Sequence, residues 1–118
     1  MVELIVDLPG GVFGLRAVGS FSVADFTTVI EPELDRLEAA DEELRLLLHL
    51  GSEFTGFGEG AWADLTSGIR DTPFRRGAVV TDDDMVRHGL RFVRWVLRGD
   101  VRSFRDHEYE RAIVWVAG

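Results

Sequence analysis

The sequence predicts a single small α/β domain, with a mixed sheet of four or five strands and about four helices. Its clearest feature is a nearly continuous apolar run, residues 44–50, which reads Leu-Arg-Leu-Leu-Leu-His-Leu. Such a run is typical of a strand buried on both faces, as in parallel sheets. After it, short β-type patterns and amphipathic helical patterns alternate to the end of the chain, which indicates strands joined by crossover helices.

The chain opens with two predicted strands. Residues 3–8 alternate and are rich in Ile and Val, and residues 12–20 again place apolar side chains on both faces. Between them, Pro9-Gly10-Gly11 is a turn signal. Because the connection is so short, the two strands are expected to form an antiparallel hairpin.

A helix is predicted to begin after Ser22. The Ser22 hydroxyl can accept a hydrogen bond from the Asp25 amide, and the Asp25 carboxylate favours the positive end of the helix dipole. Pro32 interrupts the helical pattern, because proline lacks an amide hydrogen and its ring clashes with the carbonyl four residues earlier. A kink is therefore expected near Ile30.

The elements after this helix follow from the same alternation, which gives the order ββαβαβαβα. They are the strand 44–50, a glycine-rich loop 51–60, a helix 59–71, a strand 77–81, a helix from the Asp82-Asp83-Asp84 run to Gly99, a strand 101–104 and a last helix capped by Asp106.

Composition narrows the class of protein. At 118 residues the chain is expected to be one domain, residues 1–118, and with no cysteine it has no disulfide and no zinc–thiolate site. No apolar run approaches the roughly 18 residues of a membrane span, and no basic region precedes the apolar start as in a secretory signal. We expect a bacterial, cytoplasmic protein with no stable membrane anchor.

Charge is unevenly distributed along the chain. The net charge of −8 argues against nucleic-acid binding, which depends on neutralising phosphates. Residues 1–69 carry a net −10 and residues 70–118 a net +2, and all 13 basic residues are Arg. Two halves of opposite character on one chain are complementary, which favours a homodimer or an interaction with a protein partner.

Residues at the joints between the predicted elements carry a family resemblance. They are the stretches 8–19, 24–26 with Pro32, 56–57, 61–65 (Ala-Trp-Ala-Asp-Leu) and 78–83, together with Trp115 in the last helix. In this order and spacing, over essentially the whole chain, they resemble the SpoIIAA-like group of the STAS superfamily. The resemblance implies a small mixed sheet with helices packed against it and relatives among lipid-binding CRAL-TRIO domains. Our leading hypothesis is a binding or regulatory module of this STAS-like type rather than an enzyme.

The resemblance also bears on phosphorylation. Anti-anti-sigma factors of the superfamily carry a phosphorylatable serine at the start of the helix after the third strand, in an Asp-Ser-Ser-Gly type motif. Here that helix start reads Glu59-Gly60-Ala61, and the preceding loop offers only Ser52 and Thr55. The family's phospho-switch is therefore not carried over to this chain.

A binding site is expected around the glycine-rich loop, because open α/β sheets bind ligands beyond the carboxyl ends of their parallel strands. Aromatic side chains there can line an apolar pocket, and the free amides of the helix start at 59–62 can hold an anion. The expected occupant is a partner protein or a small apolar or anionic ligand. The predicted binding residues are Ser52, Phe54, Thr55, Phe57, Glu59, Trp62 and Asp82.

The same loop mimics a dinucleotide-binding fingerprint. Residues 56–61 fit Gly-x-Gly-x-x-Ala, and Asp82 follows 21 residues after Ala61. However, the glycines begin several residues after the strand, and Glu59 would repel a pyrophosphate. The chain is also too short for two mononucleotide-binding halves, so no cofactor is expected.

Two alternatives to a binding module stay open at this stage. One is a small hydrolase or isomerase in which His49 and Asp82 act with Ser52 or Thr55, although a lone histidine in an apolar strand is more often a core residue. The other is a lipid carrier of the CRAL-TRIO type. His88 and His107 stand alone on helices, so a metal site is not expected.

The third predicted helix carries a second candidate surface. Arg87, Arg91, Arg94 and Arg98 follow at helical spacing and form a basic stripe, which is a candidate face for a partner. Met85 belongs to the apolar side of this helix in the pattern. Phe92 and Trp95 fall outside that side, so they are expected to cover a dimer contact or a ligand cavity.

Overall fold

A computed structural model describes residues 1–97 and 99–118, and it confirms a small α/β fold with a five-stranded mixed sheet. The elements in chain order are β1 (Val2–Leu4), β2 (Val12–Ala17), β3 (Gly19–Phe21), α1 (Val23–Asp25), η1 (Phe26–Ile30), α2 (Glu31–Ala40), β4 (Leu44–Leu50), β5 (Phe54–Phe57), α3 (Ala61–Arg70), β6 (Phe74–Thr81), α4 (Asp84–Val96), β7 (Asp100–Phe104), η2 (Asp106–Glu108) and α5 (Tyr109–Ala117).

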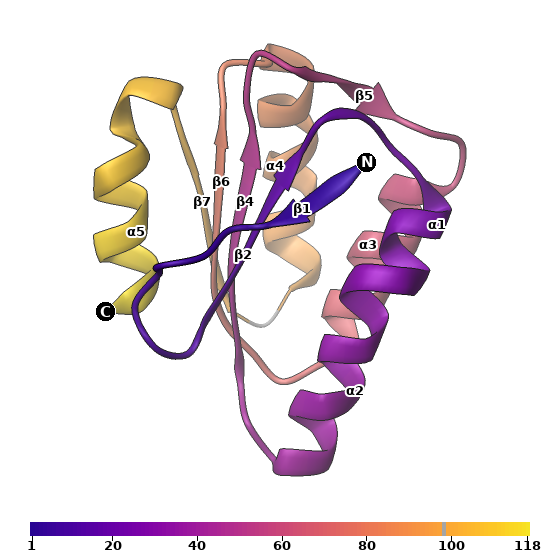
Figure 1. Ribbon diagram of the computed structural model, residues 1–118, viewed down its shortest axis with the longest axis vertical. Helices are drawn as coiled ribbons and strands as arrows, with labels where there is room; N and C mark the ends of the chain where they lie inside the picture. Colours follow the sequence, from indigo (N-terminus) through magenta and orange to yellow (C-terminus); the bar gives the residue numbers. More distant parts are fainter. Residues whose placement is uncertain (98) are drawn as a thin grey trace.

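The main sheet has the strand order β1-β2-β4-β6-β7. β1 and β2 form the expected antiparallel hairpin, with Val2 opposite Ala17, and the pairs β2–β4, β4–β6 and β6–β7 are parallel. β4 is thus the central strand, as its apolar sequence predicted. The helical segments α1 to α2, α3 and α4 cover one face of the sheet, and α5 covers the other (Figure 1).

Each face of the sheet has its own core. On the α3 and α4 face, β4 contributes Leu44, Leu46, Leu48 and Leu50 to a cluster that includes Leu65. On the α5 face, Leu47 packs with buried residues of β6, β7 and α5. The alternation of β4 therefore feeds two cores, which is the physical reason for its continuous apolar run.

The structure moves several predicted boundaries. The first strand is shorter than predicted, because β1 ends at Leu4, and β6 starts three residues earlier than predicted, at Phe74. The long second strand is divided: Gly19 has φ +70°, and the chain turns there from the main sheet into β3. The loop predicted after β4 contains β5, which pairs with β3 in a separate two-stranded parallel sheet.

The first helix shows the predicted cap and the predicted disturbance before Pro32. The Asp25 amide donates to the Ser22 hydroxyl at 3.1 Å, and the Ser22 amide donates to the Asp25 carboxylate at 2.8 Å. The disturbance takes the form of the π-helical segment η1, which ends with the Glu31 amide bonded to the Phe26 carbonyl. A wider turn moves the Thr28 carbonyl away from the proline ring, which accounts for the irregularity.

The start of the last helix differs from the prediction. Asp106 does not cap it with its side chain; instead the Glu108 carboxylate accepts from the Arg105 amide at 2.9 Å, and a short 3₁₀ turn precedes α5. This hydrogen bond is the main reason that the pKa of Glu108 lies below its ordinary value. The Asp106 carboxylate is engaged elsewhere, with a residue of β4.

Candidate functional site

Several of the predicted binding residues line an apolar hollow between β5, α3 and the start of α4. Its volume is about 390 Å³, and we call it the aromatic hollow. Its lining includes four of the seven predicted binding residues, Phe54, Thr55, Phe57 and Trp62. The remaining lining residues are Gly56, Asp83, Met85, Val86 and Gly89.

The aromatic side chains of the hollow are held by one another. The ring centroids of Phe54 and Phe57 are 5.2 Å apart, and those of Phe57 and Trp62 are 5.0 Å apart, both in edge-on arrangements. Phe57 also touches the fully buried Phe21 of β3, at 5.3 Å between centroids. This chain of rings ties the wall of the hollow to the core, so the wall is preformed.

Backbone pairing between β3 and β5 sets this wall in place. The Gly19 amide donates to the Glu53 carbonyl at 2.7 Å, and the Gly58 amide donates to the Phe21 carbonyl at 2.8 Å. Gly56, inside β5, has φ +134°, a conformation that side chains with a Cβ rarely adopt. Of the glycines that mimic a dinucleotide-binding fingerprint, Gly56 thus lies inside β5, and Gly58 and Gly60 follow this strand.

α4 completes the hollow from the other side. Asp83 caps α4 by accepting from the amides of Met85, at 2.9 Å, and Val86, at 3.3 Å. A Cβ added to Gly89 would lie 3.5 Å from the Trp62 ring, so the indole packs against α4 at this residue. Met85 was expected on the buried side of α4, but the structure leaves it 84% exposed at the rim of the hollow.

Three predicted binding residues are not part of the hollow. Ser52 and Glu59 are exposed and do not line it. Asp82 is also exposed, and its carboxylate accepts a hydrogen bond from the Asp106 amide at 3.2 Å. Asp83, one residue later, occupies the place expected for Asp82.

His49 lies on the α5 face of the sheet, away from the hollow. Its ring is 5.0 Å from the Tyr109 ring, and its Nε2 lies 3.2 Å from a carboxylate oxygen of Asp106. A carboxylate can only accept, so Nε2 carries the hydrogen that is donated. Among the described residues no hydrogen bond joins His49 to Ser52, Thr55 or Asp82, so the structure does not bring the predicted base and nucleophiles together.

The basic stripe of α4 is only partly a free surface. Arg91 and Arg94 are exposed, and Arg94 borders a shallow hollow along β7. Arg87 is half-buried, and its charge helps to lower the pKa of Glu108. Arg98 lies outside the described residues, so the fourth member of the predicted stripe has no structural account.

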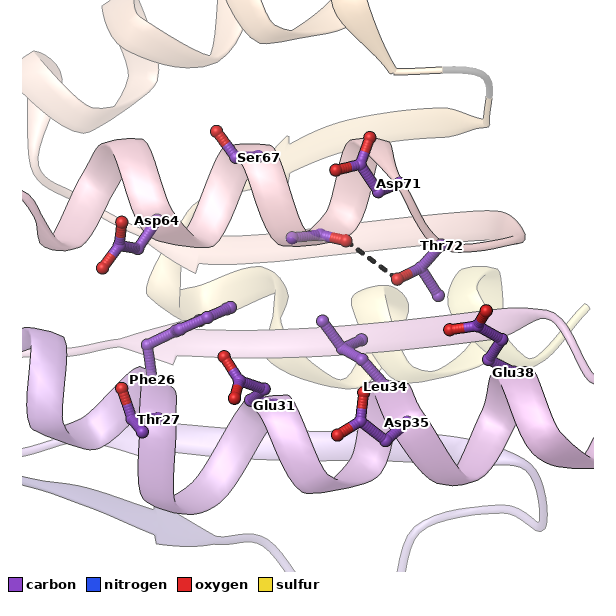
Figure 2. A pocket seen from close by; sticks show the side chains of 11 residues that line it. Phe26, Thr27, Glu31, Leu34, Asp35, Glu38, Asp64, Ser67, Asp71 and Thr72 are labelled. Atoms are coloured by element: carbon purple, nitrogen blue, oxygen red, sulfur yellow. Dashed lines mark hydrogen bonds between the residues drawn. The ribbon is translucent and has the colours of Figure 1, made fainter.

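Two further surfaces lie beside the aromatic hollow, of which the first was expected from the position of Phe92 and Trp95 in the helical pattern and the second was not foreseen as a site. α4 exposes Phe92 (78%) and Trp95 (90%), and Phe92 lines a second hollow of about 230 Å³ between α3 and α4 that reaches Trp62. On the other side of α3, an acidic groove of about 390 Å³ separates α3 from α2. Its carboxylates, from both helices, are Glu31, Asp35, Glu38, Asp64 and Asp71 (Figure 2).

The described residues contain neither a cluster of metal-binding side chains nor a membrane-spanning helix. Within residues 1–97 and 99–118, no three His, Cys, Asp or Glu side chains are placed to hold a metal ion. In that same part of the chain, no helix has the length and apolar character needed to cross a membrane.

Comparisons with known proteins agree with this architecture. A family model described as SpoIIAA-like matches residues 12–117. An uncharacterised protein from Shewanella loihica PV-4 with a SpoIIAA-like fold is 20% identical, with a TM-score of 0.74 over 98% of this chain and 93% of that one. The anti-sigma factor antagonist SpoIIAA in its unphosphorylated form is 11% identical, with a TM-score of 0.67 over 100% and 99% of the two chains. No curated protein matches.

Proposed function

The chain belongs to the SpoIIAA-like family of the STAS superfamily, and from this premise we propose that it is a non-catalytic regulatory module that binds a partner protein through the aromatic hollow. The observation that carries the proposal is the preformed hollow itself. Phe54, Phe57 and Trp62 form its wall, and Met85 stands exposed at its rim.

The chemistry of the hollow favours apolar side chains of a partner. Protein interfaces concentrate binding energy in aromatic residues and Met at a well-packed centre, and a partner residue anchored between the rings would be desolvated there. The SpoIIAA of similar fold is an anti-sigma factor antagonist. That likeness of fold supports a partner protein over a small ligand.

The alternative of a lipid carrier has less support. A carrier has to shield an acyl chain inside the protein, whereas the enclosed space between the sheet, α3 and α4 measures only about 40 Å³. By the volume that one buried water requires, this space holds about three waters. The enzyme alternative is also less favoured, because His49 is bonded to Asp106 on the face of the sheet opposite the hollow.

Peptide selection tests the proposal directly. A phage-displayed library of random peptides is selected on the purified protein, and the enriched peptides are measured against Met85→Glu and Val114→Glu. Both side chains are largely exposed, so both variants should fold, but Val114 lies on α5 and serves as the control. We expect peptides with an apolar anchor whose affinity falls at least about tenfold for Met85→Glu only, because a carboxylate would border the apolar wall.

The opposite results are equally clear. Peptides that bind the wild type and both variants with the same affinity would place recognition away from the aromatic hollow. A library that yields no binding peptide at all would remove the support for a partner segment anchored there.

A further inference from the structure

The helical face of the molecule displays three bands of different character side by side. The acidic groove lies between α2 and α3, the apolar hollows lie between α3 and α4, and the exposed arginines lie on α4. We propose that this face is a homodimer interface, in which a second copy of the chain docks by a two-fold axis that runs along the α3–α4 groove.

The order of the bands is what makes the face self-complementary. Consider a two-fold axis that lies in the interface, parallel to the helices. It places each side of the face opposite the other side of the second copy, and residues at the same height along the helices face each other. The apolar centre of one copy then meets the apolar centre of the other. The acidic band of each copy meets the basic band of its partner, whereas any axis across the helices would oppose like charges.

The spacing of the bands agrees with this axis. Packed helices lie about 8–10 Å apart, so the acidic groove is centred about 10 Å from the α3–α4 groove on one side. Phe92 lines the groove toward α3. At about 100° per residue around the helix axis, Arg91 points about 100° away from Phe92 and Arg94 about 160° away from it, both on the same side. They therefore lie on the far side of α4, also about 10 Å from the axis.

The levels along the helices agree as well. Gly89 of α4 lies against Trp62 of α3, which sets the two helices in register. Two residues further on in each helix, Arg91 is level with Asp64. In the same way Arg94 is level with Ser67, which lies across the acidic groove from Glu31 (Figure 2). The geometry thus pairs Arg91 with Asp64 and Arg94 with Glu31 of the second copy.

The exposed apolar residues supply the centre of the interface. Phe92 borders the groove, and Trp95 projects from α4 with 90% of its surface exposed. A soluble monomer seldom leaves two such side chains uncovered within one turn of a helix. In the dimer they would be covered by the α3–α4 face of the second copy.

The size of the face is sufficient for a specific dimer. α4, at 13 residues, is about 20 Å long, and three helices side by side are about 30 Å wide, which gives about 600 Å² per copy. Two copies would bury about 1,200 Å², which is at the lower end of the range for specific interfaces. A dissociation constant in the micromolar range is therefore expected.

Sedimentation velocity across a concentration series tests the proposal. The wild type, of 13.2 kDa per chain, should sediment as a dimer below about 100 μM. Arg91→Glu/Arg94→Glu and Glu31→Arg/Asp64→Arg should each weaken the dimer at least tenfold, because like charges then oppose each other. A control with the same change of charge as the first variant is Arg16→Glu/Arg111→Glu, whose exposed side chains lie outside the helical face, and it should remain dimeric.

Mixing the two charge-reversed variants provides the decisive measurement. One variant carries acidic side chains at the proposed contact positions on both sides of its apolar centre, and the other carries Arg at those positions on both sides. Together they should therefore form a heterodimer at concentrations where each alone is monomeric. This rescue also shows that both variants are folded. A monomeric wild type up to about 100 μM, charge-reversed variants that still dimerise, or a mixture that stays monomeric would each overturn the proposal.

Discussion

At the scale of single residues, two helical glycines have opposite roles. A Cβ on Gly89 of α4 would touch the Trp62 ring at an ordinary contact distance of 3.5 Å. A Cβ on Gly68 of α3 would lie 2.6 Å from the end of the Phe26 ring, which is packed in the core. In the sequence both residues are simply glycines within helical patterns. The aromatic rings that pack against them in the structure decide which glycine is required.

This difference gives a prediction of opposite signs. Gly89→Ala should raise the free energy of unfolding by about 0.5–1 kcal/mol, because Ala favours the helix and the added methyl has room. Gly68→Ala should lower the free energy of unfolding by about 1–3 kcal/mol, because the core has to shift. Urea unfolding followed by circular dichroism measures both. A shift of the same sign in the two variants would contradict the packing described around Gly68.

At the scale of elements, the first helix follows its local chemistry closely. The capping box of Ser22 and Asp25 forms as predicted, and so does the disturbance that precedes Pro32. β5 was not predicted, because it pairs with β3, which is distant in the chain. Neither short segment has a strong pattern of its own, and each becomes a strand through hydrogen bonds to the other, across more than thirty residues of chain.

The capping box predicts a pH dependence of stability. Burial alone would raise the pKa of Asp25, but the hydrogen bonds from the Ser22 amide and hydroxyl, together with the Met1 ammonium 3.4 Å away, outweigh it, so the pKa lies below the ordinary 3.8. A lowered pKa in the folded state means that the ionised carboxylate stabilises the fold at neutral pH. This contribution is lost as the pH falls through the folded pKa.

Asp25→Asn should therefore be less stable than the wild type by about 1 kcal/mol at pH 7. The difference in the free energy of unfolding should shrink as the pH falls below about 4. Urea titrations at a series of pH values measure it. A difference that stays constant down to pH 2 would show that the Asp25 charge does not contribute.

At the scale of the whole molecule, the proposed dimer and the proposed partner site share one face. The second copy would cover Trp62 and Met85, which also form the wall and rim of the aromatic hollow. Self-association and partner binding would then exclude each other, so the concentration of the protein would regulate its own activity as a binding module.

An apolar dye distinguishes the two proposals. Anilinonaphthalene sulfonate, which fluoresces on apolar surfaces, should bind the Arg91→Glu/Arg94→Glu variant more strongly than the wild type at the same high concentration, because the hollow is uncovered. Adding Met85→Glu to that variant should reduce the signal. Equal dye fluorescence of the wild type and the variant would mean that the dimer interface does not cover the hollow. The peptide experiment would then still test whether the hollow binds a partner.

The sequence by itself determined the class of fold, the central position of β4, the hairpin, the first helix cap and the grouping of Phe54, Phe57 and Trp62 that line the hollow. These depend on local pattern and on residues near one another in the chain. Only the tertiary structure decided the rest. It placed His49 beside Asp106, seated Asp83 rather than Asp82 at the hollow, and turned Met85 outward. The physical reason is that a helical or strand pattern fixes which side chains share a face, whereas the neighbouring elements decide whether that face is covered.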